Sequence, residues 1–258
     1  MDMAMRAFIL CFLLRATALA SPPWVHYAPL HGSSSFVAAI TQPYLTNAYF
    51  GNGTMTDAAY NDSLGNYGGV SFAAGTNGGA FLFSGTNWVF QSQTNRVLFG
   101  NLVNSGFTLS CWFNTRSSSG GSLCSLQTAT NSTAGMRDFP IYMNNGGNIG
   151  WAYYVGGAVT PATYNDGKWH FVVATMSESH GGQIYMDGQL VASNGNGGGI
   201  SNWAYYPAYW RIGNGDFAVW GLGASSAGWN GLVEDFRFYT VILDSSQVST
   251  LFANGPDH

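Results

Sequence analysis

The stretch "DGKWHFVVATMSESHGGQIYMDGQLVAS" (Asp166–Ser193) contains runs of β-branched and aromatic residues separated by turn signals. An Asp-Gly pair precedes the run Lys168–Met176. A second pair, Asp187-Gly188, separates Ile184–Met186 from Gln189–Ala192. A two-residue Asp-Gly turn between such runs is a strong signal for a β-hairpin. The stretch therefore predicts consecutive antiparallel strands.

Runs of the same kind recur along the chain and are bounded by Gly, Asn and Ser. They cover Phe36–Ile40, Ala80–Gly85, Phe107–Phe113, Phe139–Met143, Ile149–Val155, Tyr209–Asn214 and Gly231–Leu243. Aromatic residues make up 16% of the chain, which is too many for a disordered protein. The 35 glycines argue against a helical bundle, because glycine destabilises helix interiors. The sequence therefore predicts an all-β, antiparallel sandwich.

One short helix is predicted at the C-terminus. Asp244 is a good N-cap, and Gln247 three residues later completes a capping box. Val248, Leu251 and Phe252 follow helical spacing, and a Gly-Pro pair then ends the segment.

Residues 1–20 have the features of a signal peptide. Arg6 precedes the apolar run Ala7–Leu14, and the small residues Ala18-Leu19-Ala20 form a cleavage site. The apolar run is shorter than the roughly 20 residues that a membrane span needs. We expect cleavage after Ala20, a mature chain with no membrane span, and a secreted or extracellular-surface location. The alternative is a retained N-terminal tether.

The charge of the mature chain excludes two classes of partner. Loss of Asp2, Arg6 and Arg15 with the leader leaves 6 basic and 11 acidic residues, a net charge of −5, with Lys168 as the only lysine. Because no basic patch exists to neutralise phosphates, we expect no nucleic-acid partner. The sequence likewise has no polybasic signal for a membrane surface.

Two cysteines, Cys111 and Cys124, remain in the mature chain and flank a segment with the features of a hairpin turn. We expect a disulfide across this hairpin; the alternative is two small buried thiols on neighbouring strands. Three sequons, at Asn52, Asn61 and Asn131, are expected glycosylation sites in a secreted protein.

Several stretches together resemble the laminin G-like (LamG/pentraxin-like) jelly-roll domain of the concanavalin A-like lectin/glucanase superfamily. They are Asn61–Phe90, Phe107–Thr115, Asp166–Met176, Gln183–Ser193 and Trp229–Phe252. The resemblance implies a jelly-roll sandwich over residues 57–258. Residues 21–56 would be an N-terminal segment that contributes the first strand, in "WVHYAPL" (residues 24–30) or in Phe36–Ile40. The family binds glycans, proteins and lipids and also occurs beside catalytic modules, so the resemblance specifies fold more than function.

The last predicted strand carries two adjacent carboxylates, Glu234 and Asp235, where the family usually has two aspartates. Strand alternation places Leu232, Glu234, Phe236 and Phe238 on one face, which we take as the core face, and Asp235 and Arg237 on the other. A buried Glu234 must then be hydrogen-bonded or paired.

The resemblance also suggests a structural calcium ion, which many such jelly rolls bind through a last-strand aspartate. Asp235, together with Asp62 and carbonyl groups near Gly65-Asn66, would supply part of the oxygen ligands that calcium needs. The alternative is that Asp235 belongs to a surface ion pair or caps the end of the strand.

The sequence argues against catalysis. The glucanases that are similar in shape use a Glu-x-Asp-x-x-Glu strand, but this chain has only two glutamates, Glu178 and Glu234. Adjacent residues of a strand point to opposite faces, so Glu234 and Asp235 make a poor acid/base pair. No Gly-x-Ser-x-Gly or His-Glu-x-x-His motif occurs. His170 is interpreted as a structural histidine that is hydrogen-bonded in the sheet.

Aromatic residues outside the clear strands are the best candidates for ligand binding. Trp203, Tyr205 and Tyr206 lie in an aromatic-rich loop, and Trp220 and Trp229 flank a glycine-rich one. Trp and Tyr faces can stack on sugar rings; the alternative is that these side chains pack inside the protein.

We therefore expect a secreted, non-catalytic recognition module that binds glycan or an extracellular protein. One alternative is a structural component of an extracellular matrix, cell wall or virus particle, in which the chain is an assembly subunit. A second is a divergent carbohydrate-active enzyme.

Overall fold

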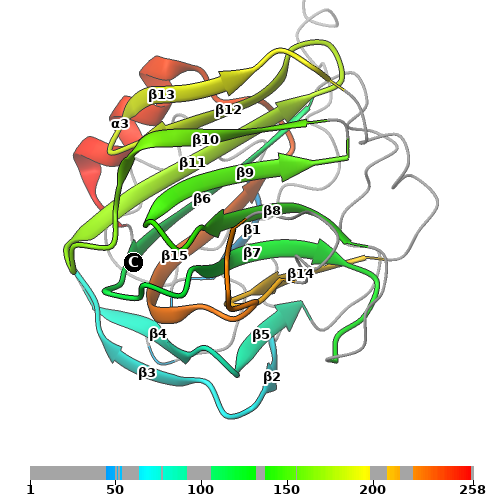
Figure 1. The fold of residues 1–258 in the computed structure, drawn as a ribbon. Helices are drawn as coiled ribbons and strands as arrows, with labels where there is room; N and C mark the ends of the chain where they lie inside the picture. The colour runs from blue at the N-terminus through cyan, green and yellow to red at the C-terminus, as the bar shows by residue number, and fades with distance from the viewer. Residues whose placement is uncertain are drawn as a thin grey trace, which may run out of the picture.

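The described part of the chain forms a β-sandwich with the helix α3 (Ser245–Asn254) on its outside (Figure 1). The structure is a computed structural model. It describes residues 45–49, 51, 53, 64–76, 78–91, 106–131, 137–154, 156–197, 208–215 and 223–256. No helix in these ranges is long and apolar enough to cross a membrane.

Sheet 1 has the strand order β13-β12-β11-β6-β15-β4-β3, and β1 also pairs with β15. Its strands are β1 (Leu45–Tyr49), β3 (Ser71–Ala74), β4 (Gly79–Ser84), β6 (Phe107–Asn114), β11 (Trp169–Ser177), β12 (Gly181–Met186), β13 (Gln189–Asn194) and β15 (Asn230–Tyr239). All of its pairings are antiparallel.

Sheet 2 faces sheet 1 and has the order β10-β9-β8-β7-β14-β5-β2. Its strands are β2 (Leu64–Tyr67), β5 (Trp88–Gln91), β7 (Gly121–Gln127), β8 (Arg137–Met143), β9 (Asn148–Tyr153), β10 (Gly156–Thr163) and β14 (Tyr209–Ile212). Its pairings are also antiparallel. The prediction of an antiparallel jelly-roll sandwich is confirmed.

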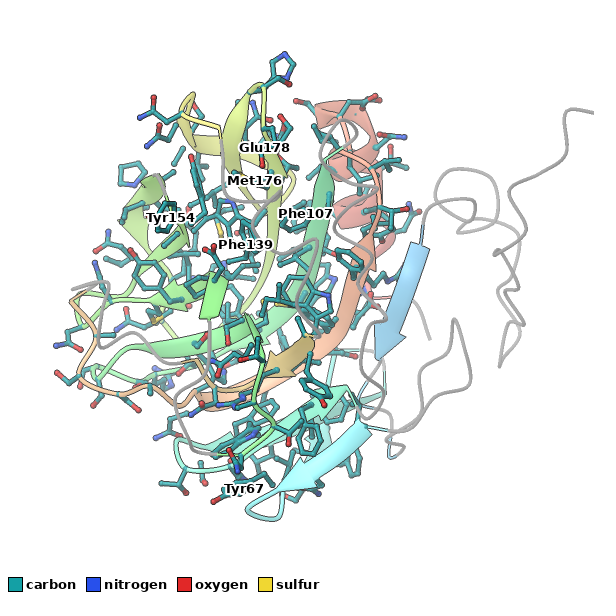
Figure 2. All side chains as sticks on the ribbon, turned by 90° about the vertical axis from the view of Figure 1, so that its right-hand side faces the viewer. Tyr67, Phe107, Phe139, Tyr154, Met176 and Glu178 are labelled. Carbon is teal, nitrogen blue, oxygen red and sulfur yellow. The ribbon has the colours of Figure 1, made fainter. Side chains whose placement is uncertain are left out.

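The core lies between the two sheets and is rich in aromatic rings. Phe107 of β6 meets Phe139 of β8 edge to face, with ring centroids 5.1 Å apart, and also contacts Trp151, Trp210 and Phe238. Figure 2 shows Phe107, Phe139 and Met176 in the interior of the sandwich. Burial of these large rings joins the two sheets, because the free energy gained grows with the apolar area removed from water.

The predicted hairpin and C-terminal helix both form. Asp187 and Gly188 have φ values of 51° and 81° and make the tight turn between β12 and β13. The helix α3 (Ser245–Asn254) has the expected capping box between Asp244 and Gln247. The apolar face of α3 packs on the outer side of sheet 1, where Trp112 stacks on Phe252 with ring centroids 5.6 Å apart.

The segment between Cys111 and Cys124 is not a hairpin turn, as the sequence had suggested. The strand β6 belongs to sheet 1 and β7 to sheet 2, so residues 115–120 connect the two sheets. Both cysteines are free thiols in the core between the sheets. The two strands do not pair, so the hairpin on which the disulfide prediction rested does not form, and the disulfide itself stays a prediction.

The strand β1 lies within the segment 21–56 that was expected to supply the first strand, and it pairs with the second half of β15. The two stretches named for that strand, residues 24–30 and Phe36–Ile40, lie outside the described residues, as does the leader.

Candidate functional site

The closing strand β15 contains a β-bulge at its two carboxylates. Its pairing with β6 shifts register between Glu234 and Arg237, and Asp235 has a φ of 55°. A bulge adds one residue and so reverses the alternation of faces beyond it. Val233, Phe236 and Phe238 consequently all belong to the core. The expectation that Glu234 shares the core face with Phe236 and Phe238 is therefore wrong.

Glu234 is nevertheless fully buried, with 0% of its surface exposed. Its Oε2 accepts hydrogen bonds from the backbone N–H of Thr76, at 2.9 Å, and from the Thr76 hydroxyl, at 3.0 Å. Gly75 leaves room for the carboxylate, since a Cβ there would lie 2.7 Å from both Glu234 oxygens. The prediction that Glu234 is hydrogen-bonded is confirmed. The residue ties β15 to the turn that follows β3.

Asp235 forms a bidentate ion pair with Arg237. The two oxygens of Asp235 accept from Nε, at 2.6 Å, and from Nη2, at 2.8 Å. Each side chain is only 4% exposed. An ion pair was one of the alternatives that the sequence left open for Asp235, but the pair is buried and not on the surface. Both carboxylates of β15 thus make structural contacts, Glu234 with Thr76 and Asp235 with Arg237.

The predicted calcium ligands are not brought together in the described part of the chain. Asp62 lies outside it, and both oxygens of Asp235 accept hydrogen bonds from Arg237. Among the described residues, no group of three or more His, Cys, Asp or Glu could hold a metal ion. Calcium binding stays a prediction.

The two core cysteines have suppressed reactivity. Burial raises the pKa of Cys124 to about 12. Burial also raises the pKa of Cys111, and the nearby Cys124 and Asp235 add to this effect. Because the thiolate is the reactive form, a raised pKa lowers the reactivity of both cysteines at neutral pH.

One of the predicted ligand-binding residues is in the core. Trp229 is 0% exposed and meets Phe113 edge to face, with ring centroids 5.5 Å apart. Its backbone bridges the two sheets, because its N–H donates to Gly213 and its carbonyl accepts from Gly85. The expectation of ligand binding is therefore wrong for Trp229. The other four candidates, Trp203, Tyr205, Tyr206 and Trp220, lie outside the described residues.

The described residues instead present an aromatic stack on the outer face of sheet 2. Tyr67 of β2 is paired with Trp88 of β5, and their rings stack with centroids 3.9 Å apart and an interplanar angle of 14°. The guanidinium of Arg211, on β14, lies 4.9 Å from the centroid of the Trp88 ring. We call these three residues the aromatic platform. Trp88 and Arg211 are buried, whereas Tyr67 is 38% exposed.

Hydrogen bonds fix the lower members of the platform. Trp88 Nε1 donates to the carbonyl oxygen of Thr130 at 3.1 Å. Arg211 donates to Asn214 Oδ1 at 3.0 Å and to the carbonyl oxygens of Ala129 and Asn131. The platform is therefore a rigid base that presents one tyrosine ring to solvent.

Further aromatic residues lie on the same strands as the platform. The Phe90 ring lies directly over Gly65, where a Cβ would come within 2.1 Å of the ring. Tyr209, two residues before Arg211, is half-buried. Figure 2 shows Tyr67 at the edge of the molecule, well separated from Tyr154, the other labelled exposed tyrosine.

His170 is hydrogen-bonded, as interpreted from the sequence. Its Nδ1 lies 2.9 Å from Asp187 Oδ2 and its Nε2 lies 3.1 Å from Asp166 Oδ1. The hydrogen bond to Asp187 raises the pKa of His170; burial opposes this effect, and Asp166 adds to it. The pKa of Asp166 is lowered to about 2, first by the backbone N–H of Lys168 and then by His170 and the Lys168 side chain.

Of the three predicted glycosylation sites, only Asn131 is among the described residues. It is exposed, and its carbonyl oxygen accepts from Arg211. Asn52 and Asn61 lie outside the described residues.

A sequence model of the concanavalin A-like lectin/glucanase superfamily, of the laminin G type, matches residues 90–249. The chain belongs to this superfamily. No curated protein sequence matches the chain. The superfamily assignment agrees with the resemblance found in the sequence and with the two-sheet topology.

Similar solved structures share the fold of this superfamily member at low sequence identity. Domain 4 of AbnA, a GH43 extracellular arabinanase from Geobacillus stearothermophilus solved with arabinotriose, has a TM-score of 0.58 and 16% identity. The match covers 80% of this chain and 97% of that domain.

Two toxin binding domains are also similar. That of botulinum neurotoxin DC, solved with SialylT, has a TM-score of 0.57, 16% identity and coverage of 82% and 51%. That of Paraclostridial Mosquitocidal Protein 1 has a TM-score of 0.59, 16% identity and coverage of 82% and 52%. The chain thus spans about half the length of these toxin binding domains.

Proposed function

We propose that this protein is a secreted, non-catalytic module that recognises carbohydrate on the outer face of sheet 2. The observation that carries the proposal is the aromatic platform, in which the exposed Tyr67 ring rests on a buried and hydrogen-bonded Trp88. A ring held in one orientation binds a flat apolar sugar face at low entropic cost, because little side-chain freedom is lost.

The ligands of the similar structures support this choice. One arabinanase domain is in complex with arabinotriose, and one botulinum neurotoxin binding domain is in complex with SialylT. Cell entry of botulinum neurotoxin type C, whose structure is also similar, depends on interaction with two ganglioside molecules. A different neurotoxin DC structure contains rat synaptotagmin II, so a protein partner is the alternative to a glycan for this fold.

A non-catalytic role is supported by the contacts that four carboxylates make inside the protein. Glu234 is bonded to Thr76 and Asp235 to Arg237. Asp166 and Asp187 both contact His170. Each of these four carboxylates is engaged within the protein, whereas glycosidases need two carboxyl groups that flank a sugar bond.

A glycan array with the secreted protein tests the proposal, followed by affinity measurements on three variants. We expect Tyr67→Ala to weaken binding of the best array ligand by about tenfold or more, a loss of ~1.4 kcal/mol. Tyr67→Phe keeps the stacked ring and should retain most of the affinity. Tyr154→Ala removes a tyrosine that is 69% exposed elsewhere on the surface and should have no effect.

Equal affinities for Tyr67→Ala and the native protein would show that the aromatic platform does not bind the glycan. If no glycan binds and the chain is recovered in a purified matrix, wall or particle, the structural-component alternative would replace carbohydrate recognition. Turnover of a polysaccharide would instead favour the enzyme alternative.

A further inference from the structure

His170 lies between two turns that are far apart in the sequence. Asp166 belongs to the turn between β10 and β11, and Asp187 opens the turn between β12 and β13. The two ring nitrogens of His170 each contact one of these carboxylates, at 3.1 and 2.9 Å. The histidine side chain is 14% exposed, whereas the side chains of Asp166 and Asp187 are 43% and 34% exposed.

Whether both contacts are hydrogen bonds depends on the protonation state of the His170 ring. A neutral imidazole has one N–H and one lone pair, whereas an imidazolium has two N–H groups, and an ionised carboxylate only accepts. Both contacts are therefore hydrogen bonds only when His170 is protonated. When the ring is neutral, a nitrogen lone pair must face one of the two carboxylates.

We propose that His170 is a pH-operated latch that ties the Asp166 turn to the Asp187 turn when protonated and releases the Asp166 turn when neutral. Which of the two histidine–aspartate contacts breaks follows from how each aspartate is held. Asp187 Oδ1 also accepts from the N–H of Phe171 at 2.8 Å, and the N–H of Asp187 donates to the Phe171 carbonyl at 2.8 Å. Asp166 has a side chain that is 43% exposed, and its partners lie within its own turn and on His170.

The other groups around the ring do not replace this switch. Lys168 Nζ lies 3.3 Å from Asp166 Oδ2, and the Arg116 guanidinium packs where a Cβ on Gly167 would lie. Tyr164 meets the ring of His170 edge to face at 5.0 Å, and burial and the charge of Asp187 raise its pKa. Of the lysine, arginine, tyrosine, aspartate and histidine side chains in this cluster, only histidine has an ordinary pKa between 5 and 8.

Release of the Asp166 turn would loosen one end of the sandwich. The N–H of Gly167 donates to Thr115 at 3.0 Å, and Asn114 Nδ2 donates to Gly167 at 3.1 Å. Asn165 Nδ2 donates to Ser117 at 3.1 Å. The turn is thus bonded to the connection between β6 and β7, and we infer that this connection gains mobility together with the turn.

The pH range of the latch follows from the direction of the shifts. Because the folded pKa of His170 is raised, the stabilisation is complete below its ordinary pKa of about 6.5. It is lost as the pH rises through the raised value. The pKa of Asp166 is lowered to about 2, so its contribution is present above about pH 4 and is lost as the pH falls toward 2.

NMR titration and amide exchange test the latch in the full protein. The ring of His170 should titrate above the ordinary histidine pKa, and Asp166→Asn should lower its pKa. After correction for intrinsic exchange, the amides of Gly167 and Lys168 should lose protection in step with this titration. The N–H of Lys168 is a direct reporter, because it donates to Asp166 Oδ1 at 2.9 Å.

The variants His170→Gln and His180→Gln form a matched pair for the exchange experiment. His180 is exposed at the opposite end of β11, and its ring contacts Ser177 and Ser179. His180→Gln should keep the pH-dependent loss of protection, and His170→Gln should abolish it. A His170 pKa at or below the ordinary value, or the same loss in His170→Gln, would overturn the latch. If His170→Gln does not fold, the native titration and Asp166→Asn decide.

Discussion

Glu234 holds Thr76 across 158 positions of sequence, through one carboxylate oxygen that accepts both the backbone N–H and the hydroxyl of the threonine. The contact joins the closing strand β15 to the turn after β3, and Gly75 gives the carboxylate its space. A buried carboxylate of this kind stabilises the fold when its acceptors are satisfied and is costly to remove when the donors stay behind.

Replacement of Glu234 should reduce stability. We expect Glu234→Ala to lower the free energy of unfolding by about 1–3 kcal/mol, because it leaves the N–H of Thr76 buried without its acceptor. Glu234→Gln keeps an oxygen acceptor and should cost less. Urea denaturation of both variants measures the difference. Equal stability of Glu234→Ala and the native protein would show that the contact with Thr76 contributes nothing.

Separation of Asp235 from Arg237 should have a larger effect. Asp235→Asn removes the negative charge and leaves the Arg237 guanidinium buried, and breaking such a pair costs roughly 3–5 kcal/mol. The double variant Asp235→Asn/Arg237→Met removes both charges and should recover part of the loss. A double-mutant cycle gives the coupling energy, and a value near zero would contradict the buried ion pair.

Asp235 also provides a test of the calcium prediction. A calcium ion that binds only the folded chain raises the melting temperature by mass action. If Asp235 is a ligand, the rise should disappear in Asp235→Asn. If Asp235 serves only Arg237, any rise with calcium should persist in that variant. Thermal melts of both proteins with calcium and with a chelator distinguish these cases.

The parts of the fold that depend on local signals were predictable from sequence. The Asp187-Gly188 hairpin and the capping box of α3 each lie within a few residues, and their geometry is set there. The strands β7 and β10 were not recognised, because "GSLCSLQ" and "GGAVTPAT" consist mostly of small residues and lack a long apolar or aromatic run. The segment between Cys111 and Cys124 was mistaken for a hairpin turn, because no local pattern shows that the strand after it belongs to the other sheet.

The parts of the candidate site that depend on strand pairing were not predictable. Tyr67 and Trp88 stack only because β2 pairs with β5 in one register, and no local pattern specifies that register. The bulge at Asp235 likewise appears only in the pairing of β15 with β6. Strict alternation therefore assigned Glu234 to the wrong face, although its need for a hydrogen-bond partner followed correctly from its expected burial.

The cysteines should resist modification in the native protein. Burial raises the pKa of both thiols, to about 12 for Cys124, so very little thiolate is present at pH 8. We expect no alkylation of Cys111 or Cys124 by iodoacetamide in buffer and complete alkylation of both in guanidinium chloride without reductant. Peptide mapping by mass spectrometry measures each site. A pair that stays unlabelled in denaturant and is lighter by two hydrogens would establish a disulfide instead.

The two tryptophans Trp229 and Trp203 should respond differently to truncation. Trp229 is fully buried, so Trp229→Ala should lower the free energy of unfolding by about 3–5 kcal/mol. Trp203 was predicted from sequence to bind ligand. If it does, Trp203→Ala should weaken binding of the array glycan with the melting temperature nearly unchanged. Trp229→Ala provides the reference for a core tryptophan in the same melts. A loss of stability in Trp203→Ala as large as in Trp229→Ala would assign Trp203 to the interior and leave glycan recognition to the platform of Tyr67 and Trp88.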